Sequence, residues 1–142
     1  MIVIPIQIYG MGGRVLDLDA GIDTGFTSGI LVSKTRARSI GLILVKPERL
    51  PKTISNEPLR GTSTVATVSI PDAGVEAETL VFCPDIDLEE TLIGSLFLAQ
   101  VGTSIKIGDL ELKYPRPNRR LKLNPYDMGD VIVPLRYGKK LR

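Results

Sequence analysis

Apolar residues alternate with polar or small residues along four segments of the chain, which is the period of β-strands with one buried face. These segments are 2–8, 14–22, 64–70 and 75–82. Turn residues at 10–13 separate the first two, and Pro71 to Gly74 separate the last two. The pattern therefore predicts two β-hairpins. Because Pro5 lacks a backbone N–H, we expect the first strand at the edge of a sheet.

Two short helices are predicted among these strands. Ser33 is a suitable N-cap for a helix over 34–40, and Gly41 is a suitable residue to end it. A second helical turn is expected over 95–100. Further strands are expected at 30–32, at 92–93 and in a hairpin over 103–112. The chain thus reads as an all-β, mainly antiparallel domain with one or two short helices.

Composition narrows the possible chemistry. The 142 residues are 43% hydrophobic, which is enough for one sizeable core, and the net charge is only +2. The absence of His excludes Ser-His and Cys-His hydrolases and most zinc sites. Cys83 is the single cysteine, expected as a small buried residue. Without a disulfide, a recognisable leader or an apolar run of membrane-spanning length, we expect a cytoplasmic protein that does not contact membranes.

Asp23, Thr24 and Gly25 directly follow the second predicted strand. Gly25 has conformational freedom that a residue with a side chain lacks, so the chain can turn sharply after the acid. The strand would hold the Asp23 carboxylate at the edge of a core, where a second carboxylate beside it would have to share a proton. The simpler alternative is a common turn in which Asp caps its own backbone and Gly is left-handed.

A calcium loop is a further alternative for this segment. Asp17, Asp19 and Asp23 are spaced as oxygen ligands around Gly21. Apolar residues stand between them, however, and no acid follows at the distance that closes such a loop. The sequence therefore favours a site without a metal.

A second motif gives the Asp-Thr-Gly turn a context. Leu92, Ile93 and Gly94 form an apolar-apolar-Gly strand that leads into the second predicted helix. Together the two motifs resemble the retropepsin-like aspartic peptidases, and most closely their stand-alone, single-domain microbial members. The resemblance covers 1–112 and implies a closed β-barrel half-domain. Since the chain has one Asp-Thr-Gly, it also implies a homodimer in which each subunit supplies one carboxylate.

The resemblance assigns Asp23, Thr24 and Gly25 to catalysis. Two Asp23 carboxylates would share one proton and activate a water molecule, so no metal or organic cofactor is needed. Thr24 would hydrogen-bond across the two-fold axis and hold the pair coplanar. These roles require that the two turns meet at the centre of a dimer.

The implied substrate is an extended or unfolded polypeptide, bound as an added strand beneath a hairpin called the flap. We expect Arg60 to Ser63 at the tip or shoulder of this flap. The expected substrate-binding residues are Phe26, Thr27, Arg60, Gly61, Thr62 and Ile93. A wall built from Ile30, Val32, Ile70 and Ile93 is expected to favour apolar side chains.

The segment 113–142 is a basic extension beyond the resemblance, expected to pack on the domain or at the dimer interface. Val131 to Leu135 is a candidate for a strand shared between subunits. The extension could also contact nucleic acid through its basic residues. Two other hypotheses stay open. One is a dimeric binding module for peptide or nucleic acid with little or no hydrolytic activity, and the other is a monomeric barrel in which Asp23 is only a turn residue.

Overall fold

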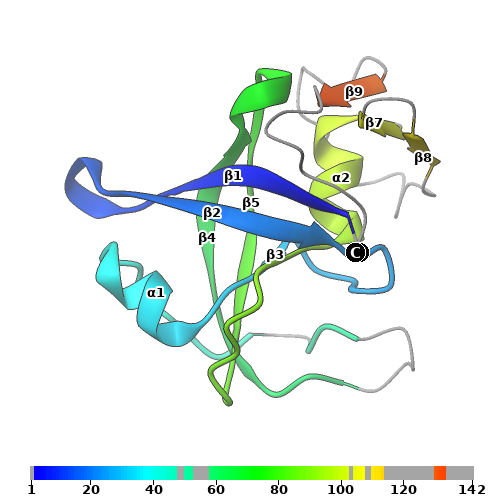
Figure 1. Cartoon of the computed structure of the whole chain (residues 1–142). Helices are drawn as coiled ribbons and strands as arrows, with labels where there is room; N and C mark the ends of the chain where they lie inside the picture. The colour runs from blue at the N-terminus through cyan, green and yellow to red at the C-terminus, as the bar shows by residue number, and fades with distance from the viewer. Residues whose placement is uncertain are drawn as a thin grey trace.

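Six strands close into a barrel in the part of the chain that the computed structural model describes (Figure 1). The described residues are 2–47, 50–52, 58–102, 104–107, 110–113 and 130–133, with the last three segments described as backbone only. The strand order around the barrel is β1-β2-β6-β3-β5-β4, and a separate sheet has the order β8-β7-β9. The prediction of a mostly β domain with two short helices is confirmed.

The first hairpin is formed by β1 (Val3–Tyr9) and β2 (Val15–Ile22), as predicted. Their antiparallel register runs from Val3 opposite Gly21 to Tyr9 opposite Val15. The turn is the short 3-10 segment η1 (Met11–Gly13), where Gly12 and Gly13 have positive φ angles of 63° and 74°. Glycine suits these positions because other residues are strained in the left-handed region.

The expected edge position of β1 is wrong. Gln7 and Ile8 of β1 also pair with Ser69 and Val68 of β4 (Gly61–Ile70), so β1 lies between two strands. Pro5 is tolerated because this second pairing is short and does not reach it.

The second hairpin joins β4 to β5 (Val75–Pro84), with Gly61 opposite Pro84 at one end and Ile70 opposite Val75 at the other. Its turn is the 3-10 segment η2 (Pro71–Ala73), followed by Gly74 with a φ angle of 66°. This confirms the hairpin predicted around Pro71 to Gly74. The ladder between these two strands is long and uninterrupted, and the pair forms one side of the barrel.

A two-residue strand, β6 (Leu92–Ile93), closes the barrel. Ile93 pairs in parallel with Ile22 of β2 and antiparallel with Ile30 of β3 (Ile30–Leu31). β3 also pairs in parallel with β5. The sheet is therefore mixed where β6 joins it. Of the two strands that pair with β6, β2 precedes the Asp-Thr-Gly turn in the chain and β3 follows it.

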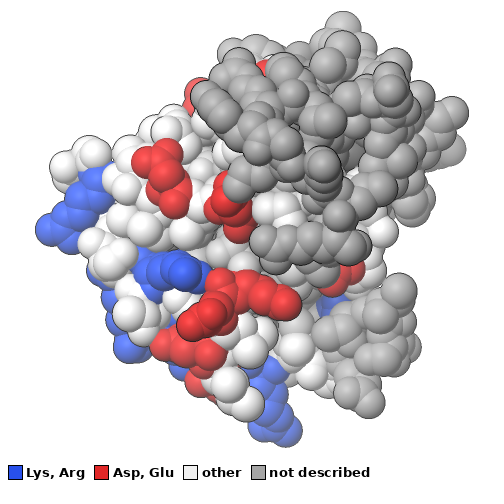
Figure 2. Space-filling model, in the orientation of Figure 1, with Lys and Arg blue, Asp and Glu red and all other residues white. Residues whose placement is uncertain are grey.

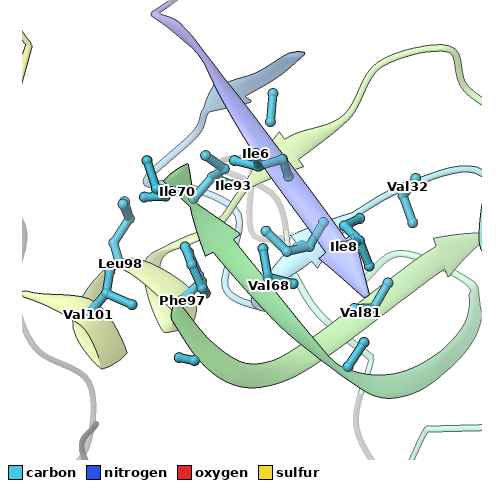
Figure 3. Packing of buried hydrophobic residues seen from close by; sticks show 14 of the residues in the cluster. Ile6, Ile8, Val32, Val68, Ile70, Val81, Ile93, Phe97, Leu98 and Val101 are labelled. Atoms are coloured by element: carbon cyan, nitrogen blue, oxygen red, sulfur yellow. The ribbon is translucent and has the colours of Figure 1, made fainter. Parts of the chain in front are cut away.

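Branched aliphatic side chains fill the barrel. Figure 3 shows Ile6, Ile8, Val68, Val81 and Ile93 among the side chains that meet there. The helix α2 (Ser95–Val101) adds Phe97, Leu98 and Val101 to the same cluster, each with no exposed surface. Burial of one such side chain contributes roughly 1.5–3 kcal/mol, so this core fixes the strands that carry the turn.

The other helix, α1 (Lys34–Ser39), begins at the predicted residue and ends one residue before the predicted end. The Ser33 hydroxyl accepts the N–H of Arg36 at 3.2 Å, and Gly41 has a φ angle of 76°. Asp87 also binds the start of α1, accepting the N–H of Lys34 at 3.0 Å and the hydroxyl of Thr35 at 2.7 Å. Acidic and basic side chains lie in neighbouring groups on the face shown in Figure 2.

The small sheet contains β7 (Ser104–Ile107), β8 (Leu110–Lys113) and β9 (Asp130–Val133). β7 and β8 form the predicted hairpin, and β9 pairs in parallel with β7. The strand expected to lie between subunits thus pairs with β7 of its own chain, and its role between subunits stays a prediction. Leu135 and the basic residues of 114–129 and 134–142 lie outside the described residues.

Candidate active site

Asp23 is the first residue after β2, and β6 holds its backbone in place. Its N–H donates to the carbonyl of Ile93 at 2.9 Å. One carboxylate oxygen, Oδ1, accepts the N–H of Gly25 at 3.0 Å, and the N–H of Phe26 donates to the Asp23 carbonyl at 3.1 Å. The side chain is half-buried, so the carboxylate is fixed in orientation while part of it faces solvent.

The backbone conformation of Gly25 differs from the expectation for the Asp-Thr-Gly turn. Gly25 is not among the described glycines with positive φ, which are Gly12, Gly13, Gly41 and Gly74. The Phe26 to Asp23 hydrogen bond closes a four-residue turn whose third residue is Gly25, and a turn with negative φ there does not need a glycine. The capping of the backbone by Asp23 is confirmed, but the left-handed glycine is wrong.

The loop that follows the turn crosses directly over Gly94. The N–H of Gly94 donates to Gly29 at 2.7 Å, and the N–H of Ser95 donates to Phe26 at 3.0 Å. A Cβ atom on Gly94 would collide with the Ser28 carbonyl oxygen. The apolar-apolar-Gly motif and the Asp-Thr-Gly motif are therefore one structural unit, in which the missing side chain of Gly94 permits the close approach.

Two residues predicted to contact substrate are instead part of the interior. Phe26 is 1% exposed and packs with Leu31 and Phe82, while Ile93 has no exposed surface. Both predictions are wrong for the same reason: proximity to the catalytic motif in sequence says nothing about which way a side chain points. Phe26 instead anchors the loop after Asp23 to β3 and β5.

The expected apolar wall is wrong as well. Its four residues have no exposed surface and belong to the barrel core. They are Ile30, Val32, Ile70 and Ile93. Burial inside the barrel keeps these side chains from contact with a substrate.

Thr27 is exposed, and it pairs with a segment distant in sequence. Its N–H donates to the carbonyl of Lys52 at 3.2 Å, and its hydroxyl oxygen accepts the N–H of Lys52 at 2.9 Å. We call residues 50–52 the strap. The carbonyl of Pro51 in the strap accepts the N–H of Leu59 at 2.9 Å. The strap thus connects the loop after Asp23 to the chain that enters β4.

The segment Arg60 to Ser63, expected at the tip or shoulder of the flap, lies where the chain enters β4. Val45 and Ser63 exchange two backbone hydrogen bonds of 2.8 and 2.7 Å, and Lys52 bridges to Pro58. Residues 58–63 therefore run antiparallel to the described residues between Val45 and Lys52. Residues 53–57 lie outside the described residues. Gly61 has a packing role, because a Cβ there would collide with the carbonyl oxygen of Cys83.

A groove of about 820 Å³ lies between the strap, the segment 43–47 and the β4–β5 hairpin. Thr27 and Ser28, from the loop after Asp23, are among its lining residues. Arg60, Gly61 and Thr62, predicted to bind substrate, do not line it, whereas Thr27 does. Sequence reasoning missed the groove because its apolar residues come from three separate segments without a common period.

Cys83 is a free cysteine and is buried. Burial raises the pKa of the Cys83 thiol to about 11, so it stays protonated and unreactive near neutral pH. No three His, Cys, Asp or Glu side chains in the described ranges group closely enough to hold a metal ion. None of the described helices has the length and apolar character needed to cross a membrane. Comparisons with family models, curated proteins and solved structures each found no match to this chain.

Proposed function

We propose that the protein is a homodimeric aspartic endopeptidase whose catalytic pair consists of Asp23 from each subunit. The observation that carries this proposal is the fixed Asp23 turn at the barrel's closure. The carboxylate is half-buried, oriented by the Gly25 N–H, and supported from below by β6 and Gly94. Such placement suits a group that must meet a symmetry-related copy in one geometry.

In the proposed reaction, two Asp23 carboxylates within hydrogen-bond distance hold one proton between them. The proton-sharing pair is the general solution for two adjacent carboxylates, and aspartic proteases are its standard example. The ionised carboxylate takes a proton from water, and the water oxygen attacks the scissile carbonyl carbon. The protonated carboxyl gives its proton to the carbonyl oxygen. As the tetrahedral intermediate collapses and the C–N bond breaks, the carboxyl that took a proton from water gives it to the leaving nitrogen. The other carboxylate takes a proton from a hydroxyl of the intermediate, which restores the pair with one shared proton.

Other residues of the loop would position rather than react. Thr24 is exposed next to Asp23, which leaves its hydroxyl available for the hydrogen bond to the opposite subunit. Phe26 keeps the loop attached to the barrel through its buried ring. Thr27, at the mouth of the groove, would contact an extended polypeptide that continues past the catalytic pair.

The test is cleavage of an unfolded protein by the wild type and by Asp23→Asn. Loss of the ionisable carboxylate should lower kcat by about a hundredfold or more, since positioned acid–base groups contribute effects of that order. Asp17→Asn is a matched control, because Asp17 is an acid on the same strand that accepts a hydrogen bond from Gln7 at 2.8 Å. Equal cleavage by the wild type and Asp23→Asn would overturn the assignment.

A dimeric peptide-binding module without useful hydrolysis is the second candidate. The apolar groove favours it, because a groove of this kind binds a polypeptide whether or not the carboxylates act on it. This alternative predicts that polypeptide binds the wild type without being cut. Cleavage that depends on Asp23 would exclude it.

A further inference from the structure

Five large apolar side chains around the groove are exposed to solvent. Their exposed fractions are 75% for Ile43, 57% for Val45, 38% for Leu50, 51% for Val65 and 44% for Leu80. Single exposed apolar residues are ordinary, but a cluster of them in a concave surface marks a binding site. Large exposed apolar residues also occur elsewhere in the described ranges, among them Ile86 and Leu88, but the groove brings five of them together in one surface.

Residues of the β4–β5 hairpin form the floor of the groove. Val65 and Leu80 are directly opposite each other on β4 and β5, as are Ser63 and Phe82. All four line the groove, on the face of the hairpin opposite to the barrel core. The segment containing Ile43 forms a bridge with β4 between Val45 and Ser63.

The charged side chains among the described lining residues have one sign. Lys46 and Lys52 are exposed and line it, and no Asp or Glu is among its described lining residues. An apolar surface bordered by two ammonium groups is complementary to an apolar side chain that has a carboxylate beside it. Basic or uncharged sequences would leave the lysines without partners.

We propose that the groove binds an extended polypeptide segment in which apolar residues alternate with Asp or Glu. The segment's apolar side chains contact Val65 and Leu80, and its carboxylates pair with Lys46 and Lys52. This inference rests on the proposed function, because the segment is the part of a substrate that extends beyond Thr27, away from Asp23. The groove thereby selects acidic, apolar substrates at a distance from the bond that is cut.

A second copy of this chain is the competing occupant. The loop after β5 contains Ile86, which is 76% exposed, and Leu88, which is 42% exposed, among Asp85, Asp87 and Glu89. This loop has the composition that the groove favours. The experiment therefore has to separate a polypeptide ligand from self-association.

The experiment measures binding of two fluorescent peptides to full-length Asp23→Asn by fluorescence anisotropy. One peptide alternates Val and Leu with Glu, and the other has Lys at every Glu position. We expect the acidic peptide to bind about tenfold more tightly at low salt, and we expect this preference to shrink as salt screens the charges. Because no cleavage is needed, the outcome does not depend on whether the wild type is a peptidase.

Variants locate the binding. Val65→Asp should abolish binding of the acidic peptide, and Lys46→Glu combined with Lys52→Glu should reverse the preference between the two peptides. Ile86→Asp, which changes an exposed apolar residue outside the groove, should bind as the parent does. Equal binding of both peptides, or binding unaffected by Val65→Asp, would overturn the proposal. So would sedimentation showing self-association that Val65→Asp and Ile86→Asp each abolish, since a second copy would then fill the groove.

Discussion

Gly94 shows how a single missing side chain joins the two motifs. The loop after Asp23 lies on this residue, and its carbonyl groups accept hydrogen bonds from the start of α2 at 2.7 to 3.3 Å. The same contact positions Asp23, because β6 ends at Ile93, immediately before Gly94, and accepts the Asp23 N–H through the Ile93 carbonyl. The stability of the loop and the geometry of the Asp23 turn therefore depend on the same few atoms.

Gly94→Ala should be strongly destabilising. Its Cβ would collide with the Ser28 carbonyl oxygen, and neither backbone segment can move without breaking hydrogen bonds. We expect a loss of about 3 kcal/mol, at the upper end of overpacking effects, measured by urea denaturation. Ser95→Ala is the control: it removes only a 3.3 Å hydrogen bond to Phe26 and should cost about 1 kcal/mol or less. Similar stabilities for the two variants would contradict the close approach.

At the scale of elements, hydrogen bonds join the strap to the loop after Asp23. Its contacts with Thr27 are two hydrogen bonds of 3.2 and 2.9 Å, both at an exposed site. Exposed pairs of this kind open at low free-energy cost.

Thr27→Val should weaken the strap without changing the fold. The substitution keeps the shape of the side chain but removes the oxygen that accepts the Lys52 N–H. We expect the Lys52 amide to exchange with solvent about tenfold faster, which hydrogen exchange with mass spectrometry or NMR can measure. Thr67→Val, on β4, should leave the Lys52 amide unchanged. An unchanged exchange rate in Thr27→Val would mean that the strap is held by other contacts.

The contact between Asp87 and the start of α1 is expected to depend on pH. The hydroxyl of Thr35, and then the backbone N–H and charge of Lys34, lower the pKa of Asp87 below its ordinary value. A carboxylate with a lowered pKa in the folded state stabilises that state above the ordinary pKa, and the stabilisation is lost as the pH falls through the lowered value. Asp87→Asn should therefore be less stable than the wild type near pH 6, and the difference should narrow below about pH 4. Urea denaturation at both pH values tests this, and a difference independent of pH would contradict it.

For the whole molecule, the sequence was sufficient for the two hairpins, both helices and the closing hairpin over 103–112. Strong alternation and local signals, such as the Ser33 cap, specify these elements without reference to the rest of the chain. The parallel pairings of β6 were not predictable, because two residues carry no periodic signal and their partners are distant in sequence. The inner position of β1 was not predictable from Pro5, because the missing N–H affects pairing only at that residue, and β4 pairs with β1 at Gln7 and Ile8.

The candidate site was predictable at its centre and not at its edges. Asp23 follows the strand and caps its turn as expected, since the motif is local. The inward direction of Phe26, the contact between Thr27 and Lys52 and the groove along β4 all depend on tertiary packing. Each subunit presents one Asp23, so the proposed chemistry belongs to a pair of molecules.

Mixing subunits tests this claim most directly. Wild-type protein and Asp23→Asn are mixed in different ratios under conditions in which subunits exchange, and peptidase activity is measured at constant total concentration. If each active site needs Asp23 from both subunits, activity should fall with the square of the wild-type fraction, because mixed dimers lack one carboxylate. Activity that falls in direct proportion to the wild-type fraction would show that each chain acts alone, and would contradict a shared catalytic pair.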